Sequence, residues 1–127
     1  MRRSFIGLVL PAAISMLLAG CGDDGPTGNG GTPPATASVN VGNVFFQSVH
    51  NGSMNPGVDT VATGGTVTWT WTAAGSHSVR FDDPGLGEGP VFSDNGSVYS
   101  KSFPAAGTYT YDCGIHGPQM TGTIVVK

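Results

Sequence analysis

A tight loop near the C-terminus constrains this chain more than any other stretch. Residues 111–120 read Y-D-C-G-I-H-G-P-Q-M and carry a thiol, an imidazole and a thioether, on Cys113, His116 and Met120. The glycines and the proline between them form turns, so the segment is predicted to be a loop rather than a helix. Two soft sulfur donors beside one imidazole suit copper, especially Cu(I). The fold must then bring a fourth donor from elsewhere, and His77 is the best candidate.

A strict alternation of apolar residues and threonines indicates the fold class. Between Thr66 and Thr72 it puts Val67, Trp69 and Trp71 on one side and the threonines on the other, as in a half-buried strand. The chain also holds 21 Gly and 9 Pro, a composition that favours short strands and turns over helices. About seven or eight such strands predict an all-β fold, an antiparallel Greek-key β-sandwich.

Three further features of the strands are predicted from the pattern. A first strand covers residues 39–46 and bends near Gly42. A strand over residues 76–81 carries His77 on its inward face, at one end of the sandwich where it can meet the C-terminal loop. Tyr109 lies early in the penultimate strand and can form a tyrosine corner, with its hydroxyl bonded to nearby backbone.

The first twenty residues have the pattern of an export signal. Two arginines precede an apolar stretch that is short for a membrane span and is broken by Pro11. The stretch ends Leu-Ala-Gly-Cys at residues 18–21, which resembles the lipobox of bacterial lipoproteins. That resemblance implies a signal peptide over 1–20 that is cut before Cys21, and a lipid on Cys21 that anchors the chain to a membrane. The alternative is an ordinary signal peptide with a chance cysteine, and the export route stays open.

Composition divides the remaining chain into a tether and one domain. Residues 21–37 are rich in Gly and Pro and lack apolar periodicity, so we expect a lipidated cysteine followed by a flexible tether. We expect residues 38–127 to form one copper-binding domain. After removal of the signal the chain keeps three basic residues against eight acidic ones. A nucleic-acid partner is therefore not expected.

Taken one by one, the candidate ligands have ordinary explanations as buried residues. Free cysteine and methionine are common in cores, and a single histidine is more often structural than a ligand. Together they match the blue-copper set, in which two His and one Cys lie in a plane and a Met binds weakly along the axis. If Cys21 is lipidated, Cys113 has no disulfide partner, and an unpaired thiol in an oxidising envelope is a liability unless it is buried or metal-bound.

The stretches Thr66–Phe81 and Gly107–Val126 resemble the plastocyanin/azurin family of small type 1 blue copper proteins, the cupredoxins. The order His, Cys, His, Met agrees with the family's. The resemblance implies that His77, Cys113, His116 and Met120 bind one copper ion, and that His116 lies near the surface as the port for electrons. The family often has Asn directly after the first histidine, where it locks the two ligand loops. Here Ser78 stands in that place, and its hydroxyl can make a similar bond.

The expected function is that of a one-electron carrier on the periplasmic side of the cell envelope, and not that of an enzyme. Multicopper enzymes place histidines directly beside the type 1 cysteine, whereas Asp112 and Gly114 flank Cys113 here. We expect a monomer whose partner is a redox protein such as a cytochrome or a respiratory complex. The acidic loop over residues 82–95 either steers a basic partner or is ordinary solvated surface.

Two alternatives remain at this stage. A periplasmic copper carrier or buffer could use the same ligands without electron transfer. A zinc site could add His50 to the two other histidines and the cysteine, but zinc would leave Met120 without a role.

Overall fold

The computed structural model describes residues 31–127 and shows an all-β domain in that range. The predicted signal peptide and Cys21 lie outside the described residues. Within 31–127 the structure contains no helix that could cross a membrane. The eight strands are β1 (Thr36–Gly42), β2 (Phe45–Ser48), β3 (Gly57–Val61), β4 (Thr66–Trp71), β5 (Arg80–Phe81), β6 (Val98–Ser102), β7 (Gly107–Cys113) and β8 (Gly117–Val126).

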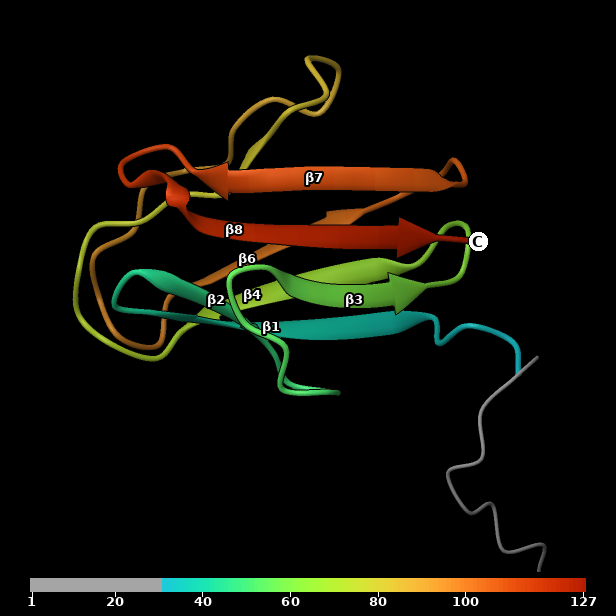
Figure 1. Cartoon of the computed structure of the whole chain (residues 1–127), viewed down its shortest axis with the longest axis horizontal. Coiled ribbons are helices and arrows are strands. Elements are labelled where there is room, and N and C mark those ends of the chain that lie inside the picture. Colours follow the sequence, from blue (N-terminus) through green and yellow to red (C-terminus); the bar gives the residue numbers. More distant parts are fainter. Residues whose placement is uncertain (1–30) are drawn as a thin grey trace, which may run out of the picture.

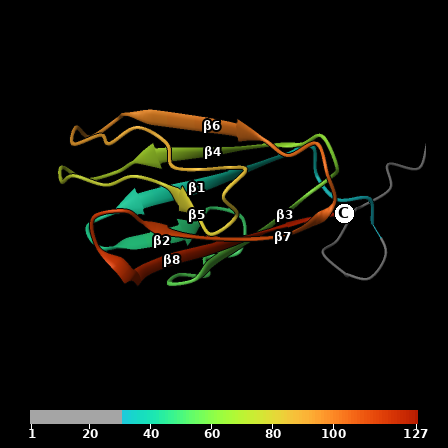
Figure 2. The same cartoon turned by 90° about the horizontal axis from the view of Figure 1, so that it is seen from above.

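The strands form two four-stranded sheets that pack face to face (Figures 1 and 2). One sheet has the order β2-β1-β4-β6 and the other has the order β3-β8-β7-β5. This confirms the predicted all-β sandwich of seven to eight strands. The pairs β1–β4 and β3–β8 are parallel, whereas the prediction was wholly antiparallel. The chain crosses between the two sheets several times. β4, for example, returns to the sheet of β1 after β3 has been added to the other sheet, and it lies parallel to β1.

The aromatic side chains of β4 occupy the centre of the core. Val67, Trp69 and Trp71 are all 0% exposed, which confirms the predicted alternation. The Trp69 ring meets the Tyr111 ring of β7 edge to face, with ring centres 5.4 Å apart, and it also contacts Phe81. Such pairs stabilise a core beyond the apolar area that they bury. Trp69 therefore links its own sheet to the sheet that carries Cys113.

The predicted first strand over residues 39–46 is wrong, because the chain turns back within it. Gly42 pairs with Phe45, so β1 and β2 form a tight hairpin with Asn43 and Val44 in its turn. Val44 has a φ of 66°, an unusual conformation for a β-branched residue. The Phe45 ring fills the space beside Gly42, where a Cβ would meet it at 2.0 Å. The alternating apolar residues on both sides of this turn resembled one bent strand.

Two other boundaries differ from the prediction. The strand expected over 76–81 is reduced to β5, and His77 makes only an isolated bridge to Phe92. His77, Ser78 and Val79 are all buried, so this segment does not alternate as a regular strand would. At the N-terminal side, β1 begins at Thr36, two residues before the predicted start of the domain.

The two ends of the described chain meet at one end of the sandwich. The Ala62 amide donates to the Pro34 carbonyl, and the Lys127 amide donates to the neighbouring Val61 carbonyl. The β7–β8 turn lies at the opposite end (Figure 1). The predicted tyrosine corner is confirmed, since the Tyr109 hydroxyl donates to the Ala105 carbonyl at 2.8 Å.

We predict that Gly122→Ala destabilises the fold through a steric clash. The ring of Tyr111 lies across Gly122, and a Cβ at residue 122 would meet the Tyr111 Cζ atom at 2.1 Å. Tyr111 is 1% exposed and cannot move aside without disturbing the core. The loss should be about 1–3 kcal/mol in the free energy of unfolding, measured by urea denaturation. Thr123→Ala on the same strand is the control, and an equal loss in both variants would contradict this explanation.

We also predict that Asp59→Asn stabilises the protein at pH 7. Asp59 is 2% exposed, and one of its carboxylate oxygens accepts a bond from the Ser48 hydroxyl while the other has no partner. Burial raises the pKa of Asp59 above 3.8, although the Ser48 bond and the charge of His50 oppose the shift. The folded protein thus binds this proton more tightly than the unfolded chain. The contribution of Asp59 to stability is therefore favourable at low pH and is lost as the pH rises through the raised pKa.

The measurement for Asp59→Asn is the difference in Tm from the unmodified protein at several pH values. The variant should melt at a higher temperature at pH 7, and the gain should disappear towards pH 4. Asp94→Asn, at an exposed aspartate, should show no such gain. A constant difference at all pH values would exclude the buried charge as the cause.

Candidate metal centre

The segment predicted as one long loop is in fact the end of a hairpin. β7 continues to Cys113 and β8 begins at Gly117, so only residues 114–116 form the turn. The register shifts here: Asp112 pairs with Thr121, whereas Cys113 pairs with Gly117. The surplus residues on β8 form a bulge, and such bulges commonly re-aim side chains next to functional sites. The prediction of a loop over 111–120 was therefore too long, because turn-forming residues can also stand in a bulged strand.

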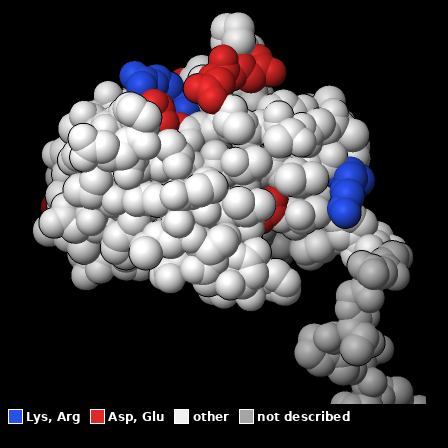
Figure 3. Space-filling view, viewed as in Figure 1, with Lys and Arg blue, Asp and Glu red and all other residues white. Residues whose placement is uncertain are grey.

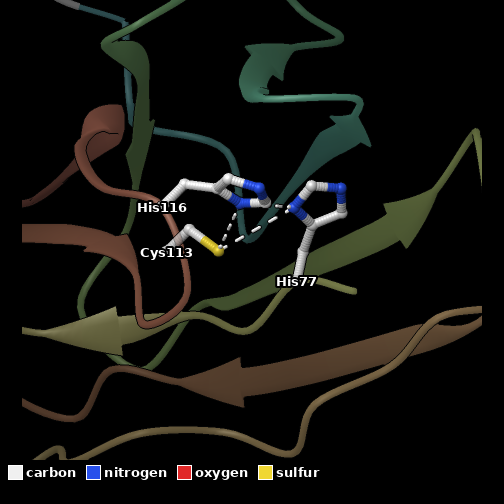
Figure 4. A group of neighbouring side chains, drawn as sticks. All are labelled: His77, Cys113 and His116. Atoms are coloured by element: carbon white, nitrogen blue, oxygen red, sulfur yellow. Dashed lines mark hydrogen bonds between the residues drawn. The ribbon is translucent and has the colours of Figure 1, made fainter. Parts of the chain in front are cut away.

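Three of the four predicted ligands meet at this end of the sandwich (Figure 4). The Nδ1 atoms of His77 and His116 lie 3.2 Å apart. The Cys113 sulfur lies 3.8 Å from the first of them and 3.5 Å from the second. A point equidistant from the three atoms is about 2 Å from each, close to the usual lengths of metal bonds to histidine nitrogen and cysteine sulfur. The donor atoms thus fit a single transition-metal ion.

Two of the three donor side chains are fully buried, and the third is half-buried. Cys113 and His77 are 0% exposed, whereas His116 is half-buried. Burial lowers the pKa of His77 below 6.5, and the nearby His116 lowers it further. A neutral imidazole offers a free lone pair, which is the form that binds metals. The Nδ1 atom of His77 faces the other two donors. Its Nε2 atom is buried without a hydrogen-bond partner.

Met120 lies on β8 with a fully buried side chain. Its neighbour Thr121 pairs with Asp112, so the register places the Met120 backbone beside Cys113. Both side chains are 0% exposed and belong to the apolar core. This position agrees with an axial donor, and the assignment of Met120 as a ligand stays a prediction.

His50 does not join this group. It is exposed in the loop after β2, where it lines a separate hollow with Val49 and Asp59. The metal-ligating group found in residues 31–127 consists of His77, Cys113 and His116 alone. A zinc site that uses all three histidines therefore has no support in the described structure.

Ser78 ties the two ligand-bearing segments together. The Gly114 amide, directly after Cys113, donates to the Ser78 hydroxyl at 3.1 Å. This is the bond predicted for the position where the family often has Asn. The same hydroxyl donates to a carboxylate oxygen of Glu88 at 2.5 Å. Contacts of this kind orient metal ligands and tune the metal that they bind.

Asp112, on the other side of Cys113, is also tied to the segment that follows His77. The Arg80 guanidinium donates to both carboxylate oxygens of Asp112, at 2.9 and 2.8 Å. Paired bonds of this type fix geometry as well as adding energy. The backbone of Cys113 is thus held at both of its neighbours.

Sequence reasoning missed Asn55, which fastens the bulged part of β8. Its side-chain amide donates to the carbonyls of Val44 and Gln119, at 2.9 and 3.1 Å. Its carbonyl oxygen accepts from the amides of Phe46 and Thr121, at 3.3 and 3.4 Å. The partners on β8 are the residues before and after Met120. These partners lie more than sixty residues after Asn55 in the sequence. In the sequence alone, Asn55 looks like an ordinary turn residue before a proline.

On the face shown in Figure 3, the end that holds the β7–β8 turn carries little charge. Several acidic and basic side chains lie near the loop after β5 on this face, and others lie towards the opposite end of the sandwich. Ile115 beside His116 is 50% exposed. A half-buried imidazole next to an apolar side chain therefore connects the buried donors to the surface. A two-sheet β-sandwich with two imidazoles, a thiolate and a buried thioether at one end defines a small single-copper protein.

Comparison with known proteins agrees with this class. The family described as copper binding proteins, plastocyanin/azurin family, matches residues 46–127. The chain belongs to this family, which confirms the predicted resemblance, and copper is the metal of its site.

Individual relatives include two bacterial amicyanins. Amicyanin-alpha of Methylorubrum extorquens is 44% identical over 71 residues, which cover 53% of this chain and 58% of that protein. Amicyanin of Paracoccus denitrificans is 42% identical over 71 residues, covering 53% of each protein. The chain thus matches little more than half the length of these curated relatives. Among solved structures, a reduced Cu(I) form of an amicyanin variant has a TM-score of 0.57 at 29% identity, covering 80% of this chain and 87% of that one.

We predict that copper raises the Tm of the metal-free protein. An ion that binds only the folded state stabilises it by about 2.7 kcal/mol when its free concentration is roughly 100 times Kd. Cys113→Ser should lose most of this gain because a hydroxyl is a poor copper ligand. His50→Ala is the matched control, since His50 lies outside the donor group, and it should keep the full gain. Equal gains in all three proteins would place the copper elsewhere.

Proposed function

We propose that this protein is a mononuclear type 1 copper protein that carries single electrons on the outside of a bacterial membrane. The observation that carries the proposal is the compact group of two imidazole nitrogens and one cysteine sulfur, held at the end of the sandwich. His77, Cys113 and His116 would hold the copper, and Met120 would supply a fourth, weaker sulfur donor. Copper, when bound, supplies a couple between Cu(II) and Cu(I).

The protein's part in this chemistry is to keep the donor atoms still. Cu(II) prefers tetragonal sites and Cu(I) accepts soft sites with fewer ligands. A packed core that holds one intermediate arrangement suits both states, so little has to move when an electron arrives. Ser78 and Asn55 supply bonds that hold the ligand segments. No step of this role needs a bound substrate, and we propose that the protein is not an enzyme.

Electrons pass through His116 in this proposal. Its ring is half-buried and borders the exposed side chain of Ile115. A small and nearly uncharged contact surface suits the brief encounters of redox partners, which bury little area. The partner is a redox protein such as a cytochrome or a respiratory complex, and the carrier itself is a monomer.

The position of the chain ends supports an anchored carrier. Pro34 lies at the end of the sandwich opposite the β7–β8 turn (Figure 1). With lipid on Cys21, the predicted tether over residues 21–37, the last two of which belong to β1, would join the domain at that far end. The copper site would then face away from the membrane on the periplasmic side and remain open to a partner.

The first test is the visible spectrum after Cu(II) is added to metal-free protein without the signal and lipid, residues 22–127. An intense blue or green thiolate-to-copper band is expected, bleached by a reductant and absent in Cys113→Ser. Met120→Leu should keep the band and raise the reduction potential, because the loss of an axial donor destabilises Cu(II) more than Cu(I). A weak band typical of nitrogen and oxygen ligands would contradict a type 1 site.

Electron self-exchange separates the proposed carrier from a copper buffer with the same ligands. Fast exchange between oxidised and reduced protein, together with rapid reduction by a cytochrome, is expected for an electron carrier. A blue protein that exchanges electrons slowly but gives up its copper readily to a chelator would instead be a buffer.

A further inference from the structure

We propose that Glu88 is a positioning residue of the copper centre. Its carboxylate orients the Ser78 hydroxyl that joins the two ligand segments, and its negative charge lowers the reduction potential. This inference rests on the electron-carrier function proposed above. In this inference Glu88 has a role that the other acidic residues of the loop over 82–95 do not share. From the sequence, that loop was expected either to steer a basic partner or to be ordinary solvated surface.

The first argument concerns the single proton of the Ser78 hydroxyl. That proton is donated to Glu88 at 2.5 Å, which leaves the oxygen lone pairs for the Gly114 amide at 3.1 Å. A hydroxyl can rotate, and its direction is set by the groups around it. Ser78 is 0% exposed, so water does not readily replace the carboxylate. Glu88 therefore decides that Ser78 acts as an acceptor towards the residue after Cys113.

The second argument is the space that Gly114 leaves. A Cβ on Gly114 would meet a carboxylate oxygen of Glu88 at 2.0 Å and the Ser78 hydroxyl at 2.7 Å. The φ angle of Gly114 lies outside the left-handed region, so its backbone does not demand glycine. The missing side chain instead allows the carboxylate to lie against the backbone that follows Cys113.

The third argument is that Glu88 is held in place from both sides. The Gly89 amide donates to the Val79 carbonyl, and the Phe81 amide donates to the Gly87 carbonyl, both at 2.9 Å. The backbone of Glu88 pairs with that of Arg80 in an isolated antiparallel β-bridge. Although the residue as a whole is exposed, its backbone belongs to a small ladder beside the ligand His77. The backbone on both sides of Glu88 is thus fixed by hydrogen bonds, and its carboxylate is held by the Ser78 hydroxyl.

The electrostatic consequence follows from this position. The carboxylate lies beside Ser78 and Gly114, which directly follow the ligands His77 and Cys113. A negative charge held close to the donors stabilises a doubly charged ion more than a singly charged one. Glu88 should therefore favour Cu(II) and lower the potential, as net charge and hydrogen bonds do at other metal centres.

The experiment compares Glu88→Gln, Glu88→Ala and the control Asp83→Asn, which removes a charge from the same loop. In Asp83 the carboxylate accepts only from the Gly85 amide. In copper-loaded protein, Glu88→Gln should raise the potential clearly more than Asp83→Asn and leave the thiolate band unchanged, because the amide oxygen can still accept from Ser78. Glu88→Ala should raise the potential as well. Gly114→Ala, which displaces the carboxylate, should shift the potential in the same direction.

Hydrogen exchange in the metal-free protein gives a readout that does not depend on copper. The Gly114 amide should exchange several times faster in Glu88→Ala than in the unmodified protein, and at an unchanged rate in Asp83→Asn. The inference is overturned if Gly114 exchange is the same in Glu88→Ala and unmodified protein, or if Glu88→Gln shifts the potential no more than Asp83→Asn. Absence of the thiolate band in unmodified protein would sink the electron-carrier function instead, and the exchange comparison would still test the contact.

Discussion

The structure depends on holding one cysteine sulfur and two imidazoles a few ångströms apart. These groups come from segments far apart in sequence, so the sandwich has to fix the end of β7 against the segment before β5. Trp69 does this from the core, by packing against Tyr111 two residues before Cys113. At the rim, the bond from the Gly114 amide to Ser78 and the bonds from Arg80 to Asp112 have the same effect. The donors can therefore keep their places while the charge of the ion changes.

Near the metal-ligating side chains the backbone is irregular. There, hydrogen bonds to side chains take the place of regular pairing between strands. The bulge in β8 removes the ladder bonds that would otherwise hold Met120, and Asn55 bonds the backbone on both sides of it. Before β5, the consecutive residues His77 and Ser78 are both buried. The Ser78 hydroxyl bonds to the Gly114 amide and so links this segment to the end of β7. Both devices satisfy backbone groups that would be costly to leave unpaired. Irregularity at this end thus carries little penalty.

Local patterns explain why much of the fold and site could be predicted from the sequence. The alternation around Trp69 indicates a strand with one buried face, and the spacing of Cys113, His116 and Met120 indicates a turn. Each of these patterns can be recognised within a few residues. Parallel pairing of β1 with β4 depends on which sheet the chain visits between them, which no local pattern records. Asn55 and Glu88 act on partners brought close only by the fold, and their own neighbours suggest an ordinary turn and an acidic loop.

Charge is unevenly distributed over this small surface. On the face shown in Figure 3, several charged side chains lie near the loop after β5, while the end that holds the β7–β8 turn carries little charge. In the proposed role, close contact with a redox partner at that end would need little desolvation of charge. Glu88 stands between these regions, with its backbone in the acidic loop and its carboxylate bonded to Ser78. The same residue can therefore belong to the charged surface and influence the metal, because the loop that displays it also forms the wall of the site.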